Sequence, residues 1–179
     1  MASNDPKPAS PNSTMKMSPE GRGRLRATEK AIYRYYNDMG KNKGHCTWGV
    51  GILAHKGVCT EEELGKKVSV EMVDQEFERK ISETERIVRR NITVSLNQAQ
   101  FDALCSLAYN AGAKGSRTTF KLVNKGDFAG AAANMALMIK VQVVEKGKKK
   151  YVIAPGLIKR RAEESAPFLT KDAAAAASK

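Results

Sequence analysis

A run of turn-forming residues between Asn37 and Gly57 most constrains the fold, because it interrupts a chain that is otherwise patterned as helices. Asn37-Asp38-Met39-Gly40 and Asn42-Lys43-Gly44 are turn signals. Cys46 to Leu53 alternates weakly, with β-branched and aromatic residues between glycines. The stretch therefore predicts a small, irregular antiparallel sheet.

Helical patterns lie on both sides of this sheet. Ser18-Pro19-Glu20 is typical of a helix start, and that helix should continue to about Tyr33 and carry Glu29 near its end. After the sheet, cap signals and apolar spacing predict helices that begin near residues 60, 69, 95, 118, 127 and 155. We expect an α+β fold in which a small β element follows the first helix and a mainly helical lobe completes one domain. A groove between two such lobes would suit a polymer.

Composition suggests the limits of this domain. Residues 1–17 hold three of the six prolines and little that could be buried, which predicts a disordered leader. We expect the folded domain over residues 18–170 and a flexible, alanine-rich tail over 171–179. The leader has no apolar segment of the secretory type, so we expect synthesis in the cytoplasm without a signal peptide.

The charge balance favours a polyanionic partner. The chain has 31 Lys and Arg against 19 Asp and Glu, a formal net charge of +12, which attracts nucleic acid, anionic membranes and bacterial cell wall alike. No apolar run approaches the roughly 20 residues that span a bilayer, so we expect no stable membrane insertion. The three cysteines lack metal-site spacing and are interpreted as free thiols, with a Cys46–Cys59 bridge as the alternative. We expect neither a metal nor a cofactor.

Glu29, Asp38 and Thr47 form a candidate catalytic set for glycoside hydrolysis. That reaction needs a carboxylic acid that protonates the leaving oxygen and a second carboxylate that activates water or attacks. Glu29 lies between Ala27 and Ala31, and an apolar wall there could keep it protonated. Asp38, which lies in a turn, should stay ionised. The Thr47 hydroxyl can orient a water. By themselves these residues are more typical of a solvated helix, a turn and a strand.

The order of these residues resembles a known family. Glu29, eight residues, Asp38 and then Thr47-Trp48-Gly49-Val50-Gly51 resemble the phage-type lysozymes, the endolysin muramidases of glycoside hydrolase family 24. Further similar segments follow in the family's order, over about residues 18–169: Ser18–Gly21, Gln100–Leu104, Leu107–Gly112, Asn124–Phe128 and Pro155–Glu164.

The resemblance implies a lysozyme-like fold and specific residue roles. Glu29 would be the general acid, and Asp38 with Thr47 would hold the attacking water in an inverting reaction; a retaining route through a covalent Asp38 adduct stays open. The substrate would be the β-1,4 bond between N-acetylmuramic acid and N-acetylglucosamine in peptidoglycan. Matching positions predict sugar contacts at Leu53, Tyr109, Asn110, Thr119 and Asn134.

The chain departs from the family pattern within the catalytic stretch. Lys30 replaces the usual glycine after the catalytic glutamate, and a loop at Lys41–Gly44 lengthens the interval from Asp38 to Thr47 by three residues. Ile52 replaces a frequent histidine. His45 and His55 flank the strand instead and are weaker candidates for a catalytic base.

Three alternatives remain beside the muramidase. A lytic transglycosylase would cut the same bond without water, but it would not need Asp38 and Thr47. A basic nucleic-acid binder is disfavoured because no recognition motif accompanies the basic clusters at Lys146–Lys150 and Lys159–Arg161. A wall-binding protein without catalysis is the third. We expect a monomer that binds peptidoglycan and anionic cell-envelope polymers, not nucleic acid. It would reach the wall through a pore or a secretion system.

Overall fold

A computed structural model describes residues 10–145 and 148–170 of the chain. The chain divides into two compact units, which are described separately. The sheet unit comprises Pro19–Glu83, and the helical unit comprises Met1–Ser18 together with Thr84–Lys179. Helix α3 (Val70–Asn91) begins in the sheet unit and ends in the helical unit.

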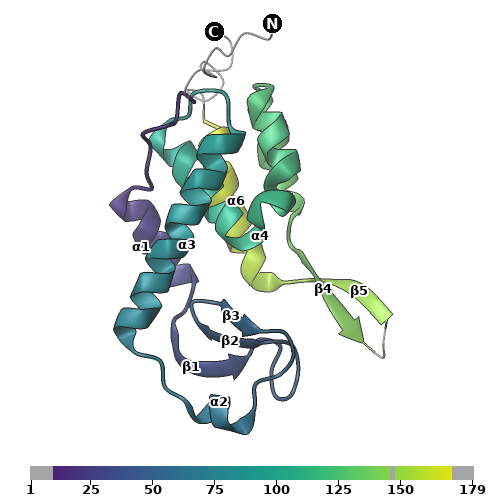
Figure 1. Cartoon of the computed structure of the whole chain (residues 1–179). Coiled ribbons are helices and arrows are strands. Elements are labelled where there is room, and N and C mark those ends of the chain that lie inside the picture. The colour runs from purple at the N-terminus through teal and green to yellow at the C-terminus, as the bar shows by residue number, and fades with distance from the viewer. Residues whose placement is uncertain (1–9, 146–147, 171–179) are drawn as a thin grey trace, which may run out of the picture. The chain divides into compact units, whose positions relative to one another are not determined.

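The sheet unit contains the predicted antiparallel sheet. It follows helix α1 (Pro19–Thr28) and is built from β1 (Ile32–Asn37), β2 (Cys46–Gly49) and β3 (Ile52–His55), in the order β1-β2-β3 (Figure 1). Bulges interrupt both pairings, which accounts for the weak alternation in the sequence. Helix α2 (Glu61–Gly65) then begins at Thr60 with a complete capping box.

Helix α1 ends earlier than the sequence pattern indicates. It stops at Thr28, and the tyrosine-rich segment expected to end the helix and lead into the turn is strand β1 instead. Tyrosine and isoleucine favour strands, and β1 gains hydrogen bonds from β2, which outweigh a weak helical tendency.

Charged contacts hold α1 against α3 inside the sheet unit. Arg26 pairs with Asp74 at 2.5 Å, and its guanidinium lies over the Phe77 ring at 5.0 Å from the centroid. Arg22 also pairs with Glu78. These contacts fix the helix whose last turn leads into Glu29.

The helical unit follows its predicted start signals near residues 95, 127 and 155, whereas the start expected near residue 118 is wrong because those residues continue a helix that is already formed. Asn97 caps α4 (Gln98–Asn124) with a capping box, Asp127 caps α5 (Phe128–Leu137), and Pro155 opens α6 (Pro155–Ser165). A short 3₁₀ helix, η1 (Ala166–Phe168), follows α6. The break expected at Gly112 is a kink within α4, where φ is 68° and ψ is 176°.

A hairpin replaces part of the predicted helical region. Strands β4 (Lys140–Glu145) and β5 (Lys148–Ile153) pair antiparallel, within the lobe expected to be mainly helical. The β-branched residues Val141, Val143 and Val152 favour strands, and this local signal was missed because lysines surround it.

Residues 10–17 contradict the expectation of a disordered leader, whereas residues 1–9 lie outside the described part. Asn12 is buried. Its amide donates to the Val94 carbonyl at 2.8 Å, and its Oδ1 accepts from the Leu96 amide at 3.0 Å. The side chain thereby satisfies backbone groups between α3 and α4 that lack helical partners, and this secures the segment. The expected tail, residues 171–179, also lies outside the described residues.

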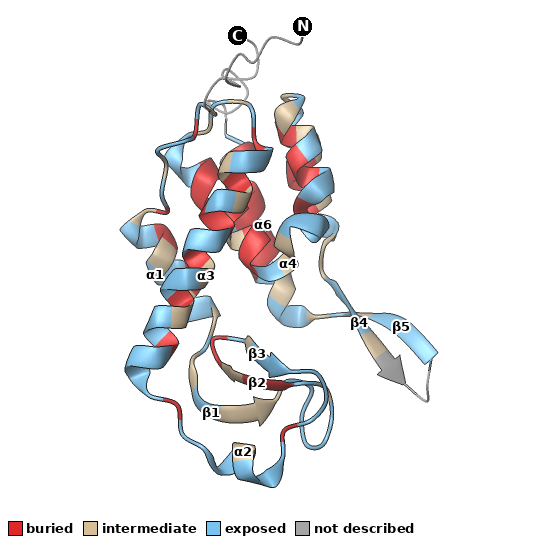
Figure 2. Cartoon of the chain, in the orientation of Figure 1, coloured by how far each residue is buried: buried red, intermediate tan, exposed pale blue. Residues whose placement is uncertain are grey.

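Each unit buries its own apolar residues, which Figure 2 shows in red along the inner faces of the helices. Leu25, Val50, Val73 and Ile81 are buried in the sheet unit. The helical unit buries a larger set: Val88, Ile92, Phe101, Leu104, Leu107, Phe120, Val123, Ala131 and Met135. None of the described helices is long and apolar enough to cross a membrane.

Candidate active site

Asp38 and Thr47 are brought together by the backbone of His45. The Asp38 amide donates to the His45 carbonyl at 3.1 Å, and the Thr47 hydroxyl donates to the same carbonyl at 3.2 Å. In return, the Asp38 Oδ1 accepts a hydrogen bond from the His45 amide at 2.8 Å. Asp38 is exposed at the end of β1, whereas Thr47 is buried in β2. Although eight residues separate these side chains, one backbone unit orients both.

Gly44 makes this arrangement possible. Its φ is +83°, and a Cβ at this position would lie 2.0 Å from the Asp38 Oδ1 and 2.8 Å from the Met39 Cγ. No side chain fits at such distances, so the Asp38 carboxylate occupies the space that the missing Cβ leaves. The inserted loop at 41–44 therefore supplies the residue that lets Asp38 turn back onto His45.

Glu29 lies directly after α1. Its amide still donates to the Leu25 carbonyl at 2.9 Å, so its backbone position is set by the last helical turn. The residue is partly buried, whereas Lys30 is exposed. The Lys30 side chain, which stands where the family usually has glycine, therefore faces solvent.

Tyr36 connects the two carboxylates electrostatically. Burial raises the pKa of its hydroxyl, and the charges of Asp38 and Glu29 raise that pKa further. Both carboxylates therefore act electrostatically on the same phenol. Tyr36 is also the β-sheet partner of Thr47. No sequence pattern distinguishes Tyr36 from Tyr33 and Tyr35; the register of β1 against β2 does so.

A disulfide supports the strand that carries Thr47. Cys46 and Cys59 are bonded to each other, with 4.5 Å between their Cα atoms, so the interpretation of these two residues as free thiols was wrong. The Cys59 amide donates to the Asn37 Oδ1 at 2.7 Å. The bridge thus ties the residues next to both Asp38 and Thr47 to one loop. Cys105 is a buried free thiol, as expected, and burial raises its pKa.

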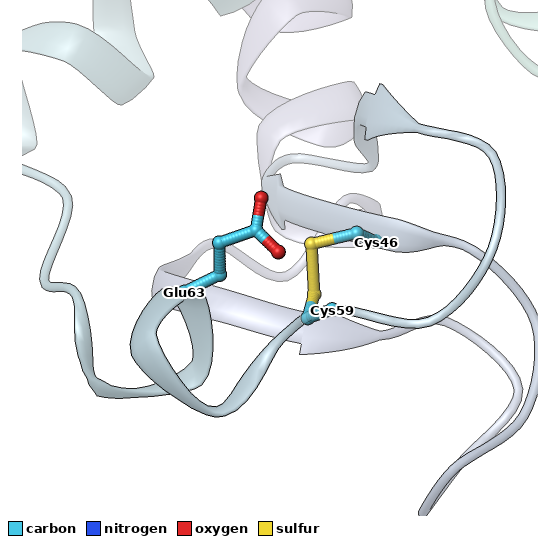
Figure 3. A group of neighbouring side chains, drawn as sticks. All are labelled: Cys46, Cys59 and Glu63. Atoms are coloured by element: carbon cyan, nitrogen blue, oxygen red, sulfur yellow. A yellow bond between two sulfur atoms is a disulfide. The ribbon is translucent and has the colours of Figure 1, made fainter.

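Glu63 points toward this disulfide, as Figure 3 shows. The three residues come close enough to resemble metal ligands, but the sulfur atoms are bonded to each other and cannot serve as thiolates. The Glu63 carboxylate accepts hydrogen bonds from the Thr60 amide and from the His55 ring, which lower its pKa to about 2. The Lys56 carbonyl, and then Glu63, raise the pKa of His55.

The predicted sugar contacts are divided between the two units. Leu53 is exposed on β3, in the same unit as Glu29. The other four lie in the helical unit. Asn110 is exposed, Tyr109 is buried, and the fully buried Thr119 donates to the Asn134 Oδ1 at 2.9 Å. The Thr119 hydroxyl is therefore used within the protein.

Comparison with known proteins identifies the family of the chain. The phage lysozyme family matches residues 26–164, which include Glu29, Asp38 and Thr47. The endolysin of Acyrthosiphon pisum secondary endosymbiont phage 1 is 36% identical over 107 residues, 59% of this chain and 70% of the relative. The endolysin of Salmonella phage P22 is 29% identical over 160 residues, 87% of this chain and 99% of the relative.

Solved structures show the same fold. The endolysin from Escherichia coli O157:H7 phage FAHEc1 has a TM-score of 0.69 and 30% identity, covering 87% of this chain and 94% of that one. A P22 lysozyme mutant has a TM-score of 0.59 and 26% identity, covering 88% and 100% respectively. The chain therefore belongs to the phage lysozyme family and is a muramidase that degrades bacterial peptidoglycan.

Proposed function

We propose that Glu29 is the general acid of this muramidase and that Asp38 and Thr47 position the attacking water. The observation that carries the proposal is that the His45 backbone orients Asp38 and Thr47 together. The charges of Asp38 and Glu29 both act on Tyr36, the strand partner of Thr47.

Thr47 and Asp38 are suited to hold one water between them. The Thr47 hydroxyl donates its proton to the His45 carbonyl, so its lone pairs remain to accept a hydrogen bond from water. The second oxygen of Asp38 can accept another. Tyr36, whose raised pKa keeps it protonated at neutral pH, retains an O–H that can donate near these oxygens.

Replacement of Glu29 tests the acid. The Glu29→Gln variant should lose roughly 10²–10⁴-fold in the lysis rate of purified peptidoglycan, while it still binds the wall. Glu20→Gln is the matched control, because Glu20 is exposed in the first turn of α1, the helix that precedes Glu29, and it should lyse at the wild-type rate. Wild-type lysis by Glu29→Gln would remove Glu29 from the mechanism.

Asp38→Asn separates charge from structure. Asparagine keeps the oxygen that accepts from His45 but lacks the negative charge, so the loop should stay intact while lysis falls. If Asp38 only anchors the loop, Asp38→Asn will lyse at the wild-type rate and Asp38→Ala will not.

Product analysis distinguishes the reaction types. Mass spectrometry should find reducing N-acetylmuramic acid ends, because water is the acceptor; anhydro ends would indicate a transglycosylase. Proton NMR of the first anomer released distinguishes inversion from retention, and inversion is expected if the carboxyl groups lie roughly 6.5–9.5 Å apart.

The positive net charge supports binding to a further class of partner, the anionic polymers of the cell envelope. With a formal net charge of +12, the enzyme should also be held by anionic envelope polymers, since a net charge of this size strengthens association with polyanions. Retention on purified walls should fall steeply as salt rises, and unchanged retention at high salt would contradict this. We also propose that the enzyme acts as a monomer. Sedimentation as a dimer would contradict that.

A further inference from the structure

The hairpin of β4 and β5 is exposed at most of its described residues. Six residue pairs run from Lys140 with Ile153 to Glu145 with Lys148, and these two strands form a sheet with no third strand in the described part of the chain. Figure 1 shows both strands extending away from the helices of their own unit, and Figure 2 shows β5 exposed along most of its length.

Apolar side chains on this hairpin face solvent. Tyr151 is 69% exposed, Ile153 is 55% exposed and Val141 is 40% exposed. Tyr151 and Ile153 project from one face, since they are two residues apart, and Val141 projects from the other. A two-stranded hairpin is at best marginally stable in water without a covered face. The hairpin therefore presents apolar surface that a partner could cover.

Lysines surround these apolar residues. Residues 140–153 contain five lysines and one glutamate, and Lys140, Lys148, Lys149 and Lys150 are exposed. Lys149 shares a face with Tyr151 and Ile153, at intervals of about 6.6 Å along the strand. Lys140, the pairing partner of Ile153, lies on that face too. One face thus combines an aromatic ring, an aliphatic side chain and at least two cations.

We propose that this hairpin binds the surface of an anionic lipid bilayer. The lysines would contact phosphate head groups, while Tyr151 and Ile153 enter the interfacial layer, where aromatic side chains with a polar tip are stable. A soluble polyanion would engage the lysines but would leave Tyr151 and Ile153 in water. The bilayer surface is the partner that satisfies both, and the contact is peripheral because the element is a short hairpin.

Vesicle co-sedimentation with the full chain tests the proposal independently of catalysis. The protein should bind vesicles of phosphatidylglycerol and phosphatidylcholine, and not vesicles of phosphatidylcholine alone. Tyr151→Ser with Ile153→Ser should weaken binding roughly tenfold or more at unchanged net charge. Val70→Ser with Met72→Ser is the matched control, because these residues are 51% and 49% exposed, and it should bind like wild type.

A charge-matched pair completes the test. Lys140 and Lys149, the lysines on the face of Tyr151 and Ile153, together changed to Gln should lose roughly 25-fold, about fivefold for each lysine. The same change at Lys114 and Lys121, exposed lysines of α4, should lose less than about fivefold. Equal losses in the two double variants would mean that binding depends on net charge alone, and the proposal would fail.

Tryptophan fluorescence identifies the partner that covers the hairpin. A Tyr151→Trp substitution in a Trp48→Phe background leaves one tryptophan, at position 151. Its emission should shift to the blue with anionic vesicles and should not shift with soluble polyphosphate. An unchanged emission with vesicles, or an equal shift with polyphosphate, would overturn the assignment to a lipid surface.

Discussion

Replacing Gly44 by alanine should separate backbone strain from damage to the catalytic carboxylate. The new Cβ would meet the Asp38 Oδ1 at 2.0 Å, and that oxygen is the acceptor for the His45 amide. A contact of this kind forces the carboxylate away and breaks the hydrogen bond. Gly40 provides the matched control, because its φ of +96° is also in the left-handed region but a Cβ there has nothing within 4 Å.

The two variants should differ in stability by the value of one charged hydrogen bond. A non-glycine residue in the left-handed region costs about 1–2 kcal/mol, and both variants lose this amount. Loss of a hydrogen bond to a charged group adds about 1.5–3 kcal/mol. The free energy of unfolding should therefore fall by roughly 3–5 kcal/mol for Gly44→Ala and by about 1–2 kcal/mol for Gly40→Ala, as measured by urea denaturation.

Activity should separate the variants further. If Asp38 positions water, a displacement of about 1 Å is enough to lower the lysis rate roughly 100-fold. Gly44→Ala should show that loss under conditions where it is folded, while Gly40→Ala should stay within about threefold of wild type. Equal unfolding midpoints and equal lysis rates for the two variants would refute the role of Gly44 in holding Asp38.

Three further outcomes test other parts of the fold. Cys59→Ser removes the disulfide, whose closed loop spans a sequence separation of 13, and should lower the free energy of unfolding by roughly 2–4 kcal/mol; wild-type behaviour under reducing and oxidising conditions alike would show that the bridge does not form. Glu164→Ala leaves two buried arginines without their carboxylate and should cost roughly 3–5 kcal/mol in urea denaturation, whereas Glu163→Ala, at an exposed pair, should cost less than about 1 kcal/mol. Glu63→Gln should lower the His55 pKa measured by NMR only partly, since the hydrogen bond to the backbone carbonyl remains. The His55 contribution to stability is present below about pH 6.5 and is lost as pH rises through its raised pKa. The Glu63 contribution is present above about pH 4.5 and is lost as pH falls toward 2.

The sequence by itself determined the local features of this protein. The helix starts at Thr60 and Asp127 were predicted correctly because a capping side chain bonds to a backbone amide three residues away. The small sheet was predicted from its turns. The order of Glu29, Asp38 and Thr47 indicated the family before any contact was known, since it depends only on spacing along the chain.

Sequence patterns were misleading where weak local signals competed. The tyrosine-rich segment became β1 rather than the end of α1, because pairing with β2 supplies hydrogen bonds that helix propensity does not predict. Strand β5 was missed as well, because its lysines are not typical of a strand and its hydrogen bonds come from pairing with β4. Such outcomes depend on which segment is available to pair, and the segment's own residues do not contain that information.

Only the tertiary structure decided how the site is assembled. The register of β1 against β2 places Tyr36, and neither Tyr33 nor Tyr35, opposite Thr47. The folded chain also joins Cys46 to Cys59. It also placed the Asp38 carboxylate in the space beside Gly44. The Asn12 side chain forms hydrogen bonds with backbone groups more than 80 residues away. These contacts form between segments distant in sequence, and burial and hydrogen-bond satisfaction in the folded chain select them, so no local pattern could have specified them.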